Sequence, residues 1–182
     1  MELTLNLREN ATRAHILDSL LKEMDGAQRE SFDALMARAA IPEKHHHGIL
    51  EVRQSIEALQ VPEGLKEHLS GVYEILANAE ATVHGCAVEE THFHEVGNAS
   101  GIRNALAICA AFFVLDPDAV HATPVQTGCG HIECAHGLMS IPAPATAAIL
   151  EGIPCASPCI EGELCTPTSA ALIRYFVTDF DA

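Results

Sequence analysis

The stretch 102–114 constrains this fold most, because on a helix its apolar side chains cover almost the whole surface. A helix of this kind is stable only where other elements surround it. Asn98 or Ser100 can cap its start, and the Asp116-Pro117 pair ends it. The sequence therefore predicts a central, buried helix from about residue 98 to 115.

The rest of the pattern places further helices and short strands around this helix. Alternating leucines over residues 1–7 favour a strand, and two amphipathic helices follow, the first ended by Gly26 and the second by Pro42. Gly85 fits the C′ position of a long helix, and Gly128 to His131 predicts a flexible turn. We expect later helices over about 49–59, 65–84, 140–152 and 166–180, and strands near 90–96 and 119–126. Residues 132–139 are expected to be a second strand or a hairpin arm.

These elements predict an α/β or α+β fold, with a helix-rich single domain around a small mixed sheet. The chain has 182 residues, of which 48% are hydrophobic, and this is enough for one sizeable core. We expect residues 1–43 to be an N-terminal helical segment resembling an αα-hairpin, and residues 44–182 to be the main domain.

Charge and hydropathy exclude two classes of partner. The net charge of −15, from 25 acidic and 10 basic residues, repels phosphate backbones, so we expect no nucleic-acid partner. The longest apolar run, 105–115, is too short to cross a bilayer, so we expect no membrane partner. The start carries no secretory signal, and an odd number of cysteines without a Cys-x-x-Cys motif favours reduced thiols and a cytoplasmic location.

Two histidines, His92 and His94, are the strongest chemical signal in the chain. Side chains two apart share a face only on an extended backbone, so a strand would aim both imidazoles at one point. Glu95 follows directly, and this donor set suits a borderline cation such as Ni²⁺ or Zn²⁺. The alternative is one hydrogen-bonded core histidine beside a solvated one.

Further histidines can complete such a site. His136 is our third candidate ligand, and Glu95 or His84 comes next. His84 falls in the last turn of a predicted helix, where it can also simply complement the helix dipole. The adjacent His45, His46 and His47 cannot all face one ion on regular structure, so we expect a weak metal-handling loop or a solvated linker.

Two other segments offer lesser chemistry. Cys155 and Cys159 are close enough in a turn-like segment to pair or to bind metal. Thr166 is a good N-cap, and with Thr168 it can hold an anion such as a phosphate at the start of a helix; the alternative is an ordinary capped helix. Glu163, just before this helix, can orient a phosphate-bearing substrate or a metal-bound histidine.

Several motifs resemble, in their order and spacing, those of the LarC-type nickel-insertion family. They are Val83-His84-Gly85, His92-Phe93-His94-Glu95-Val96-Gly97, Gly128-Cys129-Gly130, Ala135-His136-Gly137, Pro142-Ala143-Pro144-Ala145-Thr146, Gly162-Glu163-Leu164 and Thr166-Pro167-Thr168. The resemblance covers roughly residues 44–179 and includes the histidine-rich loop 45–47. It implies nickel insertion into a pyridinium bisthiocarboxylic acid mononucleotide, in a CTP-dependent step that completes the nickel-pincer cofactor of lactate racemase.

The chain also departs from the family pattern. Ser100 and Asn104 stand where the family usually has two aspartates, Ser169 stands where it commonly has glycine, and we find no glycine-rich, aspartate-containing strand before residue 44. We also expect this chain to lack the C-terminal domain that the family associates with the nucleoside triphosphate. Loss of carboxylates lowers affinity for a hard cation such as Mg²⁺ or Mn²⁺ and leaves nitrogen ligands for nickel unaffected.

We therefore predict a nickel-binding protein of nickel-pincer cofactor biosynthesis, with residues 44–182 as its metal-handling domain. As an enzyme it would be a partial or inactive nickel insertase; the alternatives are a non-catalytic Ni/Zn chaperone or storage module and a degenerate structural subunit. The expected cofactor is Ni²⁺ or Zn²⁺, and CTP with Mg²⁺ or Mn²⁺ enters only if a partner domain supplies the site. The expected partners are a nucleotide-like substrate, a separately encoded chain of the C-terminal type and a second copy of this chain.

Overall fold

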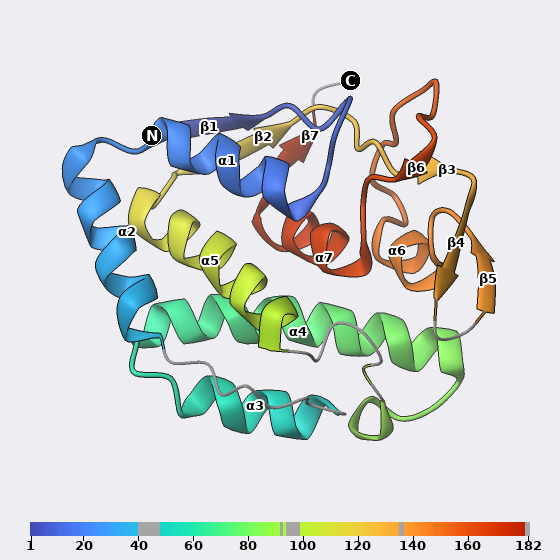
Figure 1. Ribbon diagram of the computed structural model, residues 1–182, viewed down its shortest axis with the longest axis horizontal. Coiled ribbons are helices and arrows are strands. Elements are labelled where there is room, and N and C mark those ends of the chain that lie inside the picture. Colours follow the sequence, from blue (N-terminus) through green and yellow to red (C-terminus); the bar gives the residue numbers. More distant parts are fainter. Residues whose placement is uncertain (40–47, 92, 94–98, 135–136, 181–182) are drawn as a thin grey trace.

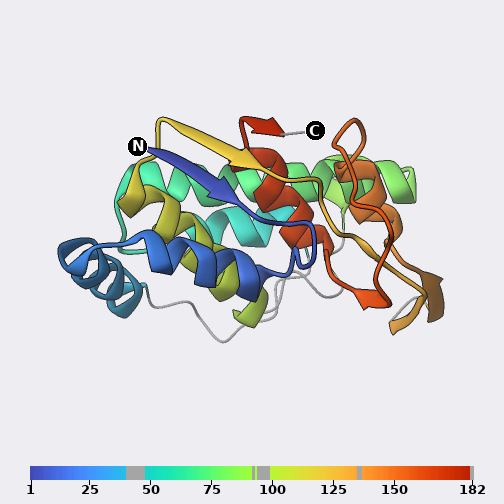
Figure 2. The same cartoon turned by 90° about the horizontal axis from the view of Figure 1, so that it is seen from above.

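The computed structural model describes residues 1–39, 48–91, 93, 99–134 and 137–180. Figure 1 shows a three-stranded sheet along one edge, with α1, α5 and α7 beneath it and α3 and α4 on the side away from it. Figure 2 shows the same arrangement from above, with α4 behind and α1 in front. One core of buried apolar side chains joins these layers.

Helix α5 (Ala99–Leu115) is the buried centre of the fold, as the sequence predicts. Ile102, Leu106 and Cys109 are at most 1% exposed. Helices α1, α2, α4 and α7 all pack against α5, so its nearly continuous apolar surface is covered from several sides.

Helix α4 (Glu63–His84) carries most of the remaining helices. It packs against α3 (Ile49–Glu57), α6 (Pro144–Ile149) and α7 (Pro167–Phe176). Gly85 ends it in the left-handed region at φ +65°, which confirms the predicted C-terminal cap. The described residues contain no helix both long and apolar enough to pass through a bilayer.

The N-terminal residues contribute a strand and two helices to the same core. After β1 (Glu2–Leu5), α1 (Arg13–Glu23) and α2 (Gly26–Arg38) make their main contacts with α5. The prediction that Gly26 ends the first helix is wrong: Gly26 begins the second, because Asp25 and Gln28 form a capping box before it. The division of the chain at residue 43 stays a prediction.

The structure confirms the predicted helix-rich α/β fold, but the strands of the described residues form three small sheets instead of one mixed sheet. Strand β2 (Ala119–Ala122) lies between β1 and β7 (Asp179–Phe180), and both pairings are parallel. The segment 132–139, expected as a second strand or a hairpin arm, forms a separate hairpin of β4 (His131–Cys134) and β5 (Gly137–Ser140). The remaining expected strand, 90–96, lies mostly outside the described residues, but Val88–Glu90 is a 3₁₀ helix.

Helix α7 ends at Phe176, earlier than predicted, because the residues after it join the three-stranded sheet. Thr178 donates its backbone N–H and its hydroxyl to the carbonyl oxygen of Val120, at 2.8 and 3.0 Å. These bonds turn the chain into β7, which pairs with β2.

The third sheet joins two glycine-containing segments. Strand β3 (Gly128–Cys129) pairs antiparallel with β6 (Gly162–Glu163). The expected flexible turn at 128–131 is therefore regular structure, fixed by a partner more than thirty residues later in the chain. Figure 1 shows β3, β6 and the β4–β5 hairpin together at one end of the molecule.

Candidate metal site

The segment that contains His92 and His94 is attached to the core by its neighbouring residues. Thr91 is 2% exposed, and its hydroxyl donates to the carbonyl oxygen of Val88 at 2.7 Å. Phe93 is also 2% exposed, and its ring meets that of Tyr73 on α4 edge-to-face, with 6.0 Å between centroids. Burial raises the pKa of Tyr73. The residues on either side of His92 are thus held in a rigid, apolar environment.

The histidine-rich loop joins the described structure beside the same point. Gly48 directly follows His47 in the sequence, and Thr91 directly precedes His92. A Cβ placed on Gly48 would lie 3.2 Å from the carbonyl oxygen of Thr91, so the two backbones are in contact. The described residues that flank the two histidine segments in the sequence, Gly48 and Thr91, therefore lie beside each other.

His84 is exposed at the C-terminal end of α4. Its Nε2 lies 3.5 Å from Oε2 of Glu80, one turn earlier on the same helix. A histidine in the last turn of a helix can complement the helix dipole. Metal binding by His84 stays a prediction.

The other predicted metal ligands lie outside the described residues; they are His92, His94, Glu95, His136, His45, His46 and His47. Within the described ranges there is no group of three or more His, Cys, Asp or Glu side chains placed to hold a metal ion. The same limit applies to Ser100, of which only the backbone is described, whereas Asn104 is exposed on α5.

The predicted anion-binding residues lie around the start of α7. The hydroxyl of Thr166 accepts the N–H of Ser169 at 3.3 Å, which confirms the predicted N-cap. Thr168, by contrast, is 1% exposed and points into the core. Glu163 lies on β6, opposite Gly128 of β3. Anion binding by these three residues stays a prediction.

Three of the sequence motifs meet at this end of α7. The hydroxyl of Thr146, at the end of the Pro-Ala-Pro-Ala-Thr motif, lies 3.5 Å from the carbonyl oxygen of Cys165. A Cβ on Gly128 would overlap the carbonyl oxygen of Gly162, so only glycine permits this approach of β3 to β6. Burial raises the pKa of the Cys165 thiol, which is consistent with a structural role.

Gln126 links several segments of this region through hydrogen bonds, and no sequence motif indicates this role. Its amide is 1% exposed and donates to the carbonyl oxygens of Arg8 and Pro158 at 3.3 and 3.1 Å. Its Oε1 accepts the N–H groups of Gly128 and Ile160 at 3.2 and 3.4 Å. One side chain thus connects the N-terminal strand region, β3 and the segment before β6.

The suggested pairing of Cys155 with Cys159 is not what the structure shows. The Cys155 thiol donates to the carbonyl oxygen of Ile153 at 3.7 Å. Cys159 lies near Cys129, thirty residues earlier in the chain, and raises the pKa of its thiol. The contacts of Cys129 with Ile160 bring this more distant cysteine beside the segment that holds Cys159.

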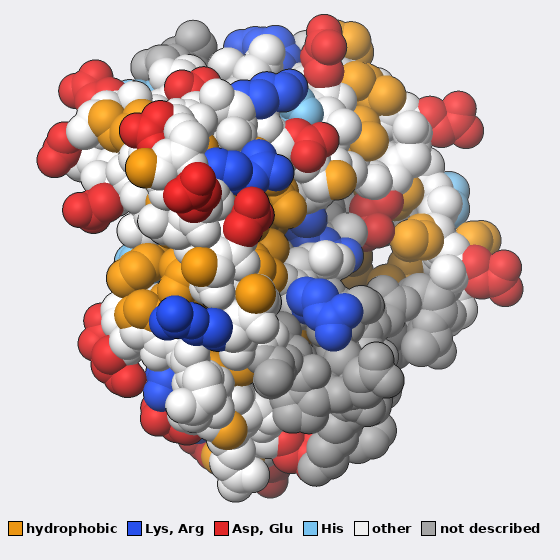
Figure 3. Space-filling model, turned by 60° about the vertical axis from the view of Figure 1, so that its left-hand side comes forward, with side chains coloured by type: hydrophobic (Ala, Val, Ile, Leu, Met, Phe, Trp, Pro, Cys, Tyr) orange, Lys and Arg blue, Asp and Glu red, His pale blue; other side chains and the backbone are white. Residues whose placement is uncertain are grey.

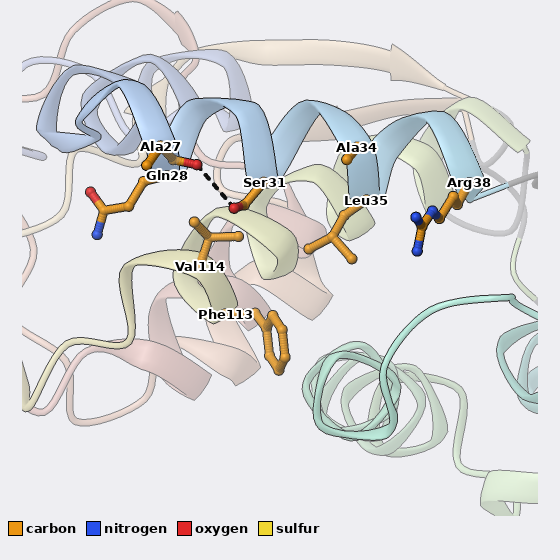
Figure 4. A pocket seen from close by; sticks show the side chains of 8 residues that line it. All are labelled: Ala27, Gln28, Ser31, Ala34, Leu35, Arg38, Phe113 and Val114. Atoms are coloured by element: carbon orange, nitrogen blue, oxygen red, sulfur yellow. Dashed lines mark hydrogen bonds between the residues drawn. The ribbon is translucent and has the colours of Figure 1, made fainter.

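A groove of about 500 Å³ opens elsewhere, between α2 and the C-terminal part of α5. Figure 4 shows its lining, in which Leu35, Phe113 and Val114 face the space and Arg38 lies at one end. Figure 3 shows apolar side chains gathered on this side of the molecule, with acidic and basic groups around them. No described residue in the lining is a His, Cys, Asp or Glu, so this groove does not provide a metal site.

The chain matches the model of the nickel insertion protein family over residues 4–182. It belongs to this family. Members of the nickel insertion family that it resembles include the pyridinium-3,5-bisthiocarboxylic acid mononucleotide nickel insertion protein of Staphylococcus saprophyticus, 36% identical over 163 residues. The proteins of the same name from Staphylococcus epidermidis and Desulfitobacterium hafniense are 35% and 36% identical over 165 and 135 residues.

These relatives are longer than this chain. The Staphylococcus saprophyticus match covers 89% of this chain but 42% of the relative, and the Staphylococcus epidermidis match covers 90% and 42%. The corresponding shares for the Desulfitobacterium hafniense protein are 74% and 34%. This chain therefore spans about two fifths of the length of the relatives it matches. No solved structure matches it.

Proposed function

We propose that this chain is the metal-handling part of a nickel insertion protein. In this proposal Ni²⁺ is the cargo, and the acceptor is the pyridinium-3,5-bisthiocarboxylic acid mononucleotide named for the relatives. The family match over residues 4–182 carries the proposal, because it spans the histidine motifs and the segments around α7 together.

The proposed nickel ligands are His92, His94 and His136, with Glu95 or His84 as a further donor. Imidazole nitrogen suits Ni²⁺, and a few such donors on an otherwise acidic protein can bind the ion and still release it to a thiocarboxylate. The buried Thr91 and Phe93 support this assignment, because they fix the backbone at both sides of His92. The contact between Gly48 and Thr91 supports a role for His45, His46 and His47 in delivering the ion.

The proposed binding region for the mononucleotide is the start of α7. A helix N-terminus attracts phosphate, and Thr166 already orders this one. Glu163 on β6 would orient the substrate, and buried Thr168 would hold the first turn in place. We further propose that CTP and its Mg²⁺ or Mn²⁺ bind to a chain of the C-terminal type, that two copies of this chain associate, and that the reaction takes place in the cytoplasm.

Calorimetric titration of the full chain with Ni²⁺ tests the metal assignment. We expect the His92→Ala/His94→Ala variant to bind nickel at least tenfold more weakly than wild type. His15→Ala is the matched control, because His15 lies on α1, outside the proposed ligand set. Its Nε2 is hydrogen-bonded to the carbonyl oxygen of Asn6. A double variant that binds nickel as tightly as wild type would refute the assignment.

A maturation assay tests the reaction itself. The chain is incubated with nickel, the mononucleotide and CTP, with and without the C-terminal part of a relative. The proposal expects nickel-containing product only when both chains are present. Intact nickel binding with no product in either mixture would instead identify a storage or chaperone module for nickel or zinc.

A further inference from the structure

Two thiols from distant parts of the sequence meet at the β3–β6 sheet. The thiol of Cys159 lies close enough to that of Cys129 to raise its pKa. The Cys129 thiol also lies 3.4 Å from the carbonyl oxygen of Ile160, the residue after Cys159. Neither cysteine is in a disulfide.

The backbone holds both cysteines in place. The N–H of Cys129 donates to the carbonyl oxygen of Ile160 at 2.9 Å, and Cys129 is bridged to Glu161 and paired with Gly162. Gln126 holds the residues on both sides of Cys159, through the carbonyl oxygen of Pro158 and the N–H of Ile160. A disulfide needs Cα atoms about 4.4–6.8 Å apart, so it requires two backbones that lie close together. The hydrogen bond from Cys129 to Ile160, the residue after Cys159, holds the two segments side by side at this point.

The pair is also accessible, in contrast to two buried cysteines of the core. Cys159 is exposed and Cys129 is half-buried, so a small reagent in solution can reach them. Cys109 and Cys165 are buried, and burial raises the pKa of both thiols, which makes them unreactive. Cys155 is exposed like Cys159, but its thiol bonds to the carbonyl oxygen of Ile153.

We propose that Cys129 and Cys159 form a reversible disulfide by exchange with a small-molecule disulfide such as oxidised glutathione. The Cys159 thiolate attacks one sulfur of the oxidant, forms a mixed disulfide and releases one glutathione thiol. The Cys129 thiolate then attacks the Cys159 sulfur and releases the second glutathione thiol. The two protons lost by the cysteines are taken up by the two glutathione thiolates, and the protein is oxidised by the two electrons that reduce the reagent.

The order of attack follows from the surroundings of the two thiols. The contact with Cys159 raises the pKa of Cys129, and the negative charge of Glu161 raises it further. Cys129 is also the less exposed of the two. Cys159 is therefore the attacking residue and Cys129 the resolving one. The disulfide would fix the segment before β6 to β3, close to the proposed mononucleotide region at α7.

Mass spectrometry of the full chain tests this inference. The protein is incubated in mixtures of reduced and oxidised glutathione, alkylated, and digested with a protease that cleaves after glutamate. Glu133 and Glu151 lie between the two cysteines, so their disulfide joins two separate peptides. We expect this cross-linked pair to form in wild type, to accumulate as the glutathione mixture becomes more oxidising, and to disappear when the mixture is made reducing.

Three variants make the test specific. Cys129→Ser should stop at one glutathione on Cys159, and Cys159→Ser should lose the cross-link. Cys155→Ser is the matched control, because Cys155 is exposed and lies in the same segment, and it should behave as wild type. The inference is overturned if wild type takes up glutathione without a cross-link, or if the cross-link joins Cys155 to either partner. Mapping of the wild-type protein decides this even if a serine variant folds poorly.

Discussion

Phe93 is the described residue between His92 and His94, and its ring is buried against Tyr73. Phe93→Ala removes this anchor and leaves a cavity, so we expect a loss of about 3–5 kcal/mol in the free energy of unfolding. If His92 and His94 bind nickel as proposed, nickel affinity should fall as well, because the residue between them loses its anchor in the core. Urea unfolding and calorimetry measure the two effects.

Phe93→Leu is the matched control for this prediction. Leucine keeps most of the apolar volume, so it should cost less than about 1.5 kcal/mol and preserve nickel binding. An alanine variant that is destabilised but binds nickel like wild type would mean that the ring supports the core and not the metal ligands.

His68 makes stability depend on pH at the point where three helices meet. Its ring on α4 packs against Phe113 of α5 and Tyr175 and Phe176 of α7, and its Nδ1 lies 3.2 Å from the Tyr175 hydroxyl. Burial lowers the pKa of His68, and the charges of Glu67 and Asp116 only partly oppose this. The folded protein therefore prefers the neutral ring.

The sign of the pH effect follows directly. Below about pH 6.5, the usual pKa of histidine, the unfolded chain binds a proton at His68 that the folded chain does not bind. The free energy of unfolding therefore decreases as the pH is lowered from about 6.5 to the lower pKa that His68 has in the folded protein. We expect His68→Asn to lose part of this slope between pH 7.5 and 5.5. Urea unfolding of both proteins across that range measures it, and equal slopes would show that His68 is not responsible.

At the scale of single elements, substitution of Gly128 tests whether the close approach of β3 to β6 depends on a glycine at this position. Both Gly128 and Gly130 have positive φ, +82° and +105°, so alanine at either position strains the backbone by roughly 1–2 kcal/mol. Only at Gly128 would the new Cβ also overlap a carbonyl oxygen, that of Gly162, whereas Gly130 faces open space.

Gly128→Ala should therefore destabilise the protein by clearly more than Gly130→Ala. It should also expose the Cys129 and Cys159 thiols to faster alkylation, because the two strands separate. Thermal unfolding and the rate of thiol modification check both effects. Equal losses in the two glycine variants would mean that backbone strain alone matters and that the strand contact contributes little.

The elements that the sequence predicts well are those whose causes are local. The centre and ends of α4 and α5 follow from apolar spacing and from the cap at Gly85, and the start of α7 follows from Thr166 and Pro167. Gly26 was assigned to the wrong helix because the Asp25 and Gln28 capping box outweighs the general preference of glycine for helix ends. Local patterns fail where a second local signal competes.

The strands and the thiol pair depend instead on partners far away in the sequence. Strand β2 takes its neighbours from the two ends of the chain, and β3 pairs with β6 over more than thirty residues. The hydrophobic pattern of a strand does not say which other strand it pairs with. The sequence therefore could not distinguish one mixed sheet from three small sheets, or indicate that Cys129 lies near Cys159. Of the candidate site, sequence located the caps and motifs, and the structure added Gln126 and Cys129 as connecting residues.

For the whole molecule, the question is whether residues 1–43 and 44–182 can fold apart. The described N-terminal residues are part of the same hydrophobic core as the rest of the chain. Strand β1 is hydrogen-bonded along β2, α1 and α2 cover α5, and the amide of Gln126 donates to the carbonyl oxygen of Arg8. Their large buried apolar side chains belong to the common core, and these are Leu3, Leu5, Leu7, Ile16, Leu20 and Phe32.

Removing residues 1–43 should therefore prevent folding of the remainder. Each large buried side chain contributes about 1.5–3 kcal/mol, so the loss of six is comparable to the whole stability of about 5–15 kcal/mol expected for a domain. The deletion also uncovers one side of α5, the most apolar helix of the chain.

We expect residues 44–182 to lose the near-UV circular dichroism signal and the cooperative urea transition that the full chain shows. Adding the separate peptide 1–43 should restore both in part, because the missing strand and helices can pair again with β2 and α5. A cooperative transition in 44–182 alone would instead establish the division predicted from the sequence, and β1 would then be a strand added to an independent metal-handling domain.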